Sequence, residues 1–196
     1  MAAFPEHRCT LEEYIELDKN SEERLEYFDG EIVSMSGGSL SHNRISTNVI
    51  TGLHNHNRSA NQGCSVFPAD MRLKVPKPPP YRYADVVVVC GAPLIEKIQG
   101  LDVLINPTLL VEILSESTEA YDRGNKFLAY QSIETFEEYL LIAQDKPYVT
   151  HYVRQPDGQW LRSDIEGLDR EINFLTVGSR IPLREIYADV EPAASS

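Results

Sequence analysis

Two short segments of this chain are apolar on both faces, and they constrain its fold more than any other feature. Residues 83–89 read YADVVVV, and residues 108–114 read TLLVEIL. A strand with one face in water alternates apolar and polar residues, whereas a central strand of a layered α/β domain is apolar on both sides. We therefore expect two central strands, each covered on both faces by other elements.

Each of these two segments contains one carboxylate, Asp85 and Glu112. An ionised carboxylate on a buried strand costs several kcal/mol unless it is paired, hydrogen-bonded or bound to a metal. Two of them on separate strands could converge on one divalent cation, and oxygen ligands suit Mg2+. The residues alone leave a second interpretation open, in which each carboxylate is solvated at a strand end or paired with an arginine.

A lysine on the next helix could reach the same place. A helix that begins near Ser117 or Thr118 carries Asp122, Lys126 and Tyr130. There Lys126 could orient an attacking water or neutralise charge that develops on a phosphoryl group. The alternative is a solvated lysine on an exposed helix face. Tyr130, four residues further on, either orients the lysine or packs in the core.

His42 and Glu26 are weaker candidates. His42 lies at the start of a helix expected over residues 41–58, capped by Ser41, and continues the apolar face of Ile45, Val49 and Leu53. A helix N-terminus attracts anions, but a core histidine is the alternative. Glu26 belongs to a hairpin around Asp29-Gly30 and is unremarkable by spacing. Asp70 is expected to be a turn residue.

The remaining elements favour a mixed α/β layer. The sequence predicts a capped helix from Thr10, an alternating strand over residues 70–75, a strand over 138–143 and a short helix near 183–187. A hairpin is expected over 149–154 and 159–162. The central order is therefore helix, three strands, helix, strand. The length of 196 residues predicts a single domain over residues 1–196, with an ordered core from about 8 to 188.

Charge is segregated along the chain. The 18 basic and 30 acidic residues give a net charge of −12, which repels a polyphosphate at long range. Residues 71–82 are the exception, because they contain no acid. Any surface that contacts phosphate must therefore be local. The basic residues of this segment are Arg72, Lys74, Lys77 and Arg82.

Several other classes of protein are not supported. The longest apolar stretch, residues 86–90, is far too short for a membrane span, and the N-terminus has no secretory signal. The three cysteines, at positions 9, 64 and 90, are widely spaced, which predicts neither a disulfide framework nor a zinc site. We therefore expect a reduced, cytoplasmic protein. Neither a phosphate-binding glycine loop nor a GxSxG elbow occurs.

At the level of motifs the sequence resembles the Uma-two family, which belongs to the restriction-endonuclease-like PD-(D/E)XK superfamily. The resemblance covers residues 8–188, and the segment VEILSESTEAYDRGNKFLAY is its most specific part. Supporting parts are LEYFDGEIVSMS, SHNRISTNVITGL, DMRLKV, YRYADVVVV and EEYLLI. It implies a restriction-endonuclease-like core, a mixed β-sheet flanked by helices, with an N-terminal helix and hairpin and a C-terminal hairpin. It also implies Mg2+-dependent hydrolysis of phosphodiester bonds, with Mn2+ as a substitute and DNA as the expected substrate.

The resemblance assigns roles to individual residues. Asp85 and Glu112 match the metal-binding carboxylates, and Lys126 matches a lysine moved onto the following helix. Glu26 matches the acid before the DGEI turn, and His42 matches the histidine that opens a helix. Two departures are Ala84, where a proline usually precedes the aspartate, and Leu114, where the wider superfamily has a lysine. Because Leu114 cannot supply the amine that the superfamily's lysine provides, a nuclease activity would need Lys126.

The resemblance also sets expectations about partners. The nucleic acid backbone would be held by Arg72, Lys74, Lys77 and Arg82, since backbone contacts position without reading sequence. A homodimer is expected by analogy. The alternative from another class is a catalytically silent module that uses the same scaffold to bind nucleic acid or a protein, which the net charge and the displaced lysine favour.

Overall fold

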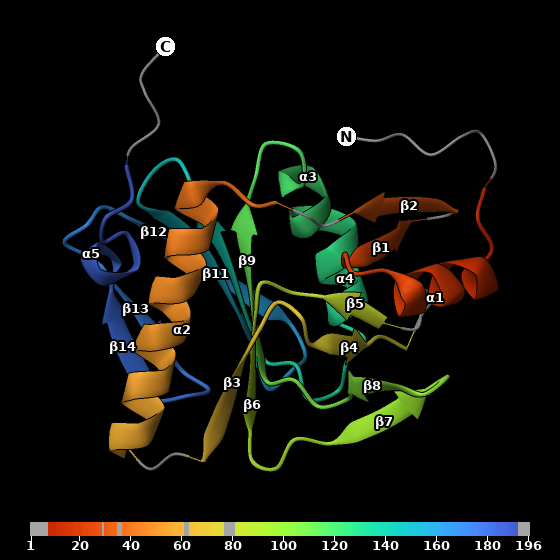
Figure 1. The fold of residues 1–196 in the computed structure, drawn as a ribbon. Coiled ribbons are helices and arrows are strands. Elements are labelled where there is room, and N and C mark those ends of the chain that lie inside the picture. The colour runs from red at the N-terminus through yellow and green to blue at the C-terminus, as the bar shows by residue number, and fades with distance from the viewer. Residues whose placement is uncertain (1–7, 29, 35–36, 61–62, 77–80, 192–196) are drawn as a thin grey trace.

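A six-stranded mixed sheet forms the centre of the computed structural model, which describes residues 8–28, 30–34, 37–60, 63–76 and 81–191 (Figure 1). Its strand order is β12-β11-β10-β9-β6-β3, and only β9 and β10 are parallel neighbours. The strands are β3 (Cys64–Pro68), β6 (Val86–Cys90), β9 (Leu109–Leu114), β10 (Glu138–Ala143), β11 (Tyr148–Arg154) and β12 (Trp160–Glu166). Every residue of β9 is buried, and so is every residue of β6 except Cys90, which confirms the two expected central strands.

Different elements cover the two faces of this sheet. One face packs against α2 (Leu40–Ala60), α5 (Leu183–Ile186) and the hairpin of β13 (Glu171–Phe174) and β14 (Ser179–Pro182). Gly52 allows α2 to approach β14, because a Cβ there would lie 2.9 Å from Cδ1 of Ile181. On the other face α4 (Phe127–Tyr130) packs into the core, and it is preceded along the chain by α3 (Glu119–Tyr121) and η1 (Asp122–Lys126). The sheet flanked by helices confirms the expected fold class.

A smaller layer lies beside the central sheet and carries the N-terminal elements (Figure 1). It contains a second sheet in the order β5-β4-β8-β7, formed by β4 (Arg72–Lys74), β5 (Tyr81–Tyr83), β7 (Ile95–Ile98) and β8 (Leu101–Leu104). Helix α1 (Leu11–Asn20) begins with the expected capping box between Thr10 and Glu13. The hairpin of β1 (Leu25–Phe28) and β2 (Glu31–Ser34) turns at Gly30, whose φ of +91° requires glycine.

Three local expectations are wrong. The strand of residues 70–75 belongs to the smaller sheet, and the third core strand is instead β3. The segment 83–89 is divided between β5 and β6, because the Asp85 side chain takes the Ile113 N–H at the point where the backbone pairing would continue. The cap of α2 comes from Ser39, whose hydroxyl accepts the N–H of His42, rather than from Ser41.

The interpretation of the cysteines is also wrong. Cys64 and Cys90 lie opposite each other in the β3–β6 register, with Cα atoms 4.0 Å apart, and form a disulfide. Their pairing depends on β3, which the sequence pattern did not indicate. Disulfides are rare in the cytosol, so this bond counts against the expected reduced, cytoplasmic setting. Among the described residues, no helix is both long and apolar enough to cross a membrane.

Some expectations fall on residues outside the described ranges. They concern Lys77, an expected phosphate contact, and Asp29 of the hairpin turn. The hairpin of β11 and β12, the short helix α5 and the turn at Asp70 lie where the sequence predicted them.

Candidate active site

Asp85 and Glu112 come together at one end of the β6–β9 pair. Val86 lies opposite Val111 in the antiparallel register, so Asp85 and Glu112 occupy the next position along. Oδ2 of Asp85 accepts the backbone N–H of Ile113 at 2.7 Å. The two carboxylates are therefore neighbours, with Asp85 just before β6 and Glu112 within β9, as the interpretation with a shared cation expects.

Glu112 is almost fully buried, and its Oε1 contacts two side chains. Nζ of Lys126 lies 3.0 Å from Oε1 of Glu112, and the Tyr130 hydroxyl lies 3.0 Å from the same atom. The Tyr130 hydroxyl also lies 2.9 Å from the carbonyl oxygen of Tyr83. Tyr130 therefore contacts the carboxylate rather than the lysine, and ties it to β5.

The helix after β9 delivers the lysine through a π-helical turn. Residues 122–126 form η1, a wider turn of a kind that is frequent at functional sites. It places Asp122 and Lys126 on one side, with Nζ of Lys126 3.4 Å from Oδ1 of Asp122. The same ammonium lies 3.6 Å from Oε1 of Glu26 on β1. Elements far apart in sequence thus meet around one buried lysine.

We call this group the acid cluster, and its negative charge exceeds its positive charge. It consists of Glu26, Asp85, Glu112, Asp122 and Lys126, none of which is more than 9% exposed. Three carboxylates lie within 3.6 Å of one ammonium, the fourth is that of Asp85, and His42 beside Asp85 supplies a further cation when it is protonated. Such an excess of buried negative charge is unfavourable unless protons or a cation compensate it.

The protonation equilibria reflect this excess. Burial raises the pKa of Glu112 well above its ordinary value, and the charge of Lys126 offsets this only in part. Burial likewise raises the pKa of Asp122. Burial alone would lower the pKa of Lys126, but Glu112, Glu26 and Asp122 outweigh it and raise that pKa well above its ordinary value. Lys126 is therefore a permanent cation, and the cluster favours retention of a proton on a carboxyl group.

His42 connects α2 to Asp85. Its Nε2 lies 3.2 Å from Oδ1 of Asp85. Burial alone would lower the pKa of His42, but the hydrogen bond and the charge of Asp85 outweigh it and raise that pKa. Burial would raise the pKa of Asp85, yet His42, Lys126 and the Ile113 N–H together lower it. Asp85 is thus the ionised carboxylate and Glu112 the protonatable one.

The donor set fits a hard divalent cation. The cluster offers carboxylate oxygens, which are the ligands that Mg2+ prefers, and Mg2+ typically binds one or two carboxylates and keeps several waters. Within the described ranges no three His, Cys, Asp or Glu side chains form a ready metal cage. The pair of Asp85 and Glu112 is therefore compatible with Mg2+ and unsuitable for a fully protein-coordinated ion.

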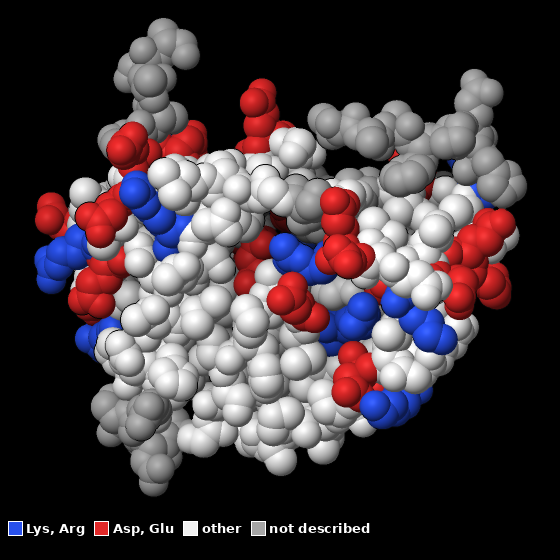
Figure 2. Space-filling model, in the orientation of Figure 1, with Lys and Arg blue, Asp and Glu red and all other residues white. Residues whose placement is uncertain are grey.

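The basic residues expected to hold a nucleic acid are already engaged by protein groups. Arg72 forms an ion pair with Asp18 at 3.1 Å, and Lys74 forms one with Glu96. Arg82 is buried and donates to the Tyr121 hydroxyl. On the face drawn in Figure 2, Lys and Arg side chains are interspersed with Asp and Glu rather than gathered in one patch. The expectation of a separate basic surface from these three residues is therefore not supported.

Two residues carry no signal in the sequence that assigns them to the site: Asp122, a member of the cluster, and Tyr121, which lies beside it. Asp122 was placed on the helix but not in the site, although its position four residues before Lys126 puts both on one helix face. The Tyr121 ring lies between two cations, 5.7 Å from the guanidinium of Arg82 and 5.9 Å from Nζ of Lys126. Nothing in the spacing of Tyr121 and Arg82 indicates this contact, which depends on how β5 meets the helix.

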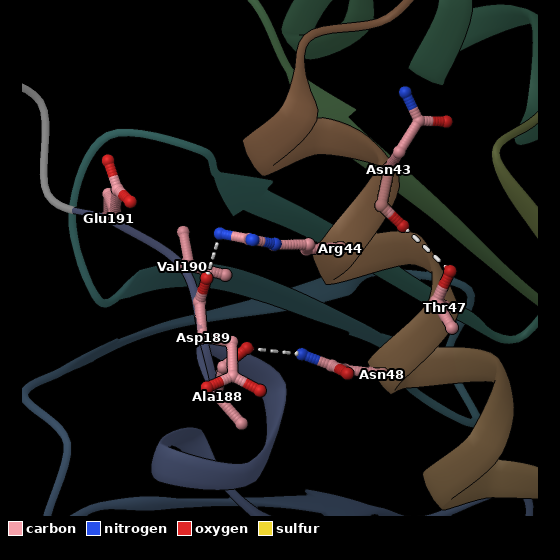
Figure 3. Close-up of a pocket in the computed structure, with 8 residues that line it drawn as sticks. All are labelled: Asn43, Arg44, Thr47, Asn48, Ala188, Asp189, Val190 and Glu191. Atoms are coloured by element: carbon pink, nitrogen blue, oxygen red, sulfur yellow. Dashed lines mark hydrogen bonds between the residues drawn. The ribbon is translucent and has the colours of Figure 1, made fainter.

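A separate pocket of about 670 Å3 lies between α2 and residues 188–191 (Figure 3). No residue of the acid cluster lines it. Figure 3 shows Arg44 and Asn48 turned toward the C-terminal segment, where Asn48 donates to the Ala188 carbonyl at 3.0 Å and Arg44 to the Asp189 carbonyl. These hydrogen bonds connect α2 to the C-terminal segment, which gives both side chains a structural role. We therefore do not assign the candidate site to this pocket.

Comparisons with known proteins agree with this geometry. The Uma2 family, described as "Putative restriction endonuclease", matches residues 11–184. Two Synechocystis proteins with the names slr1290 and sll1609 are 33% and 34% identical to this chain; the matches cover 95% and 84% of it, and 94% and 92% of those proteins. A crystal structure from Anabaena variabilis, described as a putative nuclease belonging to DUF820, superposes with a TM-score of 0.71. That match covers 91% of this chain and 97% of the other at 17% identity, so it supports the fold alone.

Proposed function

We propose, from the premise that this chain belongs to the Uma2 family, that it is a divalent-metal-dependent endonuclease that hydrolyses phosphodiester bonds in DNA. The observation that carries this proposal is the excess of buried carboxylate charge around Lys126. A divalent cation would compensate that excess, whereas a cluster that only supports the fold is expected to balance its charges among its own residues.

Asp85 and Glu112 are the residues that would hold Mg2+, with Mn2+ as a substitute. Such a cation supplies neutralisation of phosphate charge and lowers the pKa of a water molecule. Asp85 is pre-oriented by the Ile113 N–H and by His42, so its carboxylate direction is fixed before any ligand arrives. Lys126 and Tyr130 both contact Oε1 of Glu112, so a cation could bind Oε2 without breaking these two contacts.

Lys126 acts as a fixed positive charge in this proposal. Its raised pKa keeps Nζ protonated, so it does not take a proton from the attacking water. It instead stabilises negative charge that develops on the phosphoryl oxygens, or orients the nucleophile by donating a hydrogen bond. Asp122 and Glu26 hold the ammonium in place from opposite elements.

His42 and Glu26 complete the site. His42 contacts Asp85 through Nε2 and has a raised pKa, which suits a proton donor or a phosphate contact. Glu26 contacts Lys126 and lies 3.4 Å from the backbone nitrogen of Tyr83, which suits a further metal contact or a proton-transfer group. The guanidinium of Arg82 and Nζ of Lys126 lie 5.7 Å and 5.9 Å from the centre of the Tyr121 ring. This proximity makes Arg82 a candidate phosphate contact.

The test is cleavage of supercoiled plasmid and of linear duplex DNA with Mg2+, with Mn2+ and with EDTA. We expect metal-dependent cleavage that Asp85→Asn abolishes, by about a thousandfold or more, with a melting temperature close to that of the wild type. Asp102→Asn is the matched control, because Asp102 lies on β8 of the smaller sheet and forms an exposed ion pair with Lys97 rather than with a residue of the cluster. Equal cleavage by Asp85→Asn and the wild type would reject the site.

A catalytically silent binding module is the second candidate. The net charge of −12, Leu114 in place of a lysine and the absence of a three-residue metal cage among the described residues favour it. Binding of DNA by the wild type without cleavage in any metal would support the module. Cleavage that depends on Asp85 would exclude it.

A further inference from the structure

β12 forms one edge of the central sheet, and half of its backbone groups point away from β11. The β11–β12 hairpin closes with the Gln155 N–H donating to the Gln159 carbonyl at 2.7 Å. In an antiparallel pair, hydrogen-bonded and non-hydrogen-bonded positions alternate from such a closing pair. The register pairs Arg154 with Trp160 next, so alternate residues of β12 direct their N–H and C=O groups outward. These residues are Trp160, Arg162, Asp164 and Glu166.

The side chains along this edge are accessible. Residues 161–164 are all exposed, and Leu161 is 60% exposed. Proteins usually protect an edge strand with proline, a bulge, charged side chains or a short length, because its unpaired groups accept another strand. β12 has seven residues and contains neither proline nor glycine, and its charged side chains carry both signs, so that they can pair with those of another strand. Its edge is therefore suitable for pairing with a further strand.

The sequence of β12 is complementary to itself. Around Ser163 it reads Leu-Arg-Ser-Asp-Ile, with Arg162 and Asp164 placed symmetrically about the serine. We propose that β12 pairs antiparallel with β12 of a second copy of this chain, about a two-fold axis at Ser163. Arg162 then lies opposite Asp164 of the partner subunit, and Leu161 lies opposite Ile165 of the partner subunit. This inference does not depend on the nuclease proposal.

The backbone pattern agrees with this register. Ser163 directs its N–H and C=O toward β11, so a Ser163–Ser163 pair is a non-hydrogen-bonded pair, in which the strands approach most closely. A small side chain suits that position. Arg162 and Asp164 direct their backbone groups outward, so they form the flanking hydrogen-bonded pairs. The backbone hydrogen-bonding pattern of β12 and the charges of its side chains therefore favour the same two-fold axis, at Ser163.

Neighbouring registers are disfavoured by charge. A two-fold centre at Arg162 places two arginines opposite each other, and a centre at Asp164 places two aspartates opposite each other. A centre at Ile165 places Asp164 opposite Glu166 of the partner subunit. Like charges directly opposite on paired strands are destabilising, whereas opposite charges stabilise the pair. The centre at Ser163 avoids all of these contacts.

The other edge of the sheet is less suitable. β3 ends in Pro68, which lacks a backbone donor, and its first four residues are partly buried. Helix α2 packs beside it. A second copy of the chain is therefore expected to pair through β12.

The test is the oligomeric state of the full chain by sedimentation velocity at 1–100 µM, with a charge-reversal series. We expect a reversible dimer in the wild type. Arg162→Glu and Asp164→Arg should each raise the dimer dissociation constant at least tenfold, since each places like charges opposite each other. The double variant Arg162→Glu with Asp164→Arg restores both pairs and should return to within threefold of the wild type.

Controls separate the interface from local stability. Within one chain Arg162 also contacts Asp164 at 3.0 Å, so each single reversal loses an exposed ion pair. Arg180→Glu loses a similar exposed pair, with Glu171, on the β13–β14 hairpin and should leave the dimer unchanged. A monomer at 100 µM would overturn the proposal, and so would a dimer whose dissociation constant ignores the single reversals. Dissociation by the single reversals without rescue in the double variant would also contradict the proposed register.

Discussion

The molecule contains two polar clusters that share Tyr83 but differ in charge balance. One is the acid cluster. The other, which we call the Asp18 cluster, consists of Asp18, Arg72, Tyr81 and Tyr83. Asp18 accepts from Nη2 of Arg72 at 3.1 Å, from both tyrosine hydroxyls at 3.0 Å and from the Leu25 N–H at 3.2 Å. One carboxylate there has one guanidinium and three further donors.

The difference distinguishes a cluster that supports the fold from one that is prepared for a ligand. In the Asp18 cluster every carboxylate oxygen has donors and the charges cancel, which is how a buried ion pair becomes tolerable. In the acid cluster three carboxylates share one ammonium, the fourth pairs with His42, and burial raises the pKa of Glu112. Tyr83 belongs to both environments, because its hydroxyl contacts Asp18 while its carbonyl contacts Tyr130.

The largest expected effect comes from matched amide substitutions in the two clusters. Asp18→Asn replaces an acceptor with an N–H group that faces Arg72 and two tyrosines, and we expect it to lower the free energy of unfolding by about 3 kcal/mol. The melting temperature should fall by roughly 6–12 °C. Glu112→Gln should stay within about 1 kcal/mol of the wild type in EDTA, or be more stable, because it relieves repulsion.

Urea unfolding of both variants measures this difference directly. Equal destabilisation by the two amides would show that the acid cluster is a structural network of the same kind as the Asp18 cluster.

A smaller effect is expected in the pH dependence of stability. The raised pKa of Glu112 means that the folded protein keeps a proton that the unfolded chain has already lost, so unfolding releases it. The free energy of unfolding should therefore fall as pH rises from about 4.5 toward the raised pKa, by up to about 1.4 kcal/mol per pH unit. The measurement is the free energy of unfolding of the wild type minus that of Glu112→Gln from pH 5 to 8 in EDTA, a quantity that should decrease steadily as pH rises. A constant difference would contradict a protonated Glu112.

The smallest effect concerns Tyr130. Tyr130→Phe removes a hydroxyl that contacts Glu112 and the Tyr83 carbonyl, and should cost about 1 kcal/mol of unfolding free energy. If the hydroxyl positions Glu112, kcat should fall by about tenfold or less with KM unchanged. Tyr27→Phe is the matched control, because Tyr27 donates to the Cys9 carbonyl outside the cluster. Equal effects of both variants on kcat would exclude a positioning role for Tyr130.

The central site was predictable from the sequence to a large extent. Asp85 and Glu112 are visible because a carboxylate inside an apolar strand is anomalous, and the antiparallel register brings them together. Lys126 follows from the helix after β9. Glu26 carries no such signal, since it is one of nine acids between residues 11 and 31, and only the family resemblance selected it.

The remaining features depend on tertiary contacts that no local pattern encodes. The sequence of β3, Cys-Ser-Val-Phe-Pro, has no pattern that predicts a strand, and without this strand the partner of Cys90 cannot be inferred. Arg72 and Lys74 look available in the sequence, but Asp18 and Glu96 reach them from α1 and β7. The break at Asp85 depends on a side chain that replaces a backbone hydrogen bond.

The most direct test of the central claim is a titration of Mg2+ or Mn2+ against thermal stability in the wild type and in Glu112→Gln. A cation that binds the folded state alone raises the melting temperature in a saturable way. We predict such a rise in the wild type and its loss in Glu112→Gln, with Asp102→Asn behaving as the wild type. No response in the wild type, or an equal response in Glu112→Gln, would contradict a metal site between Asp85 and Glu112.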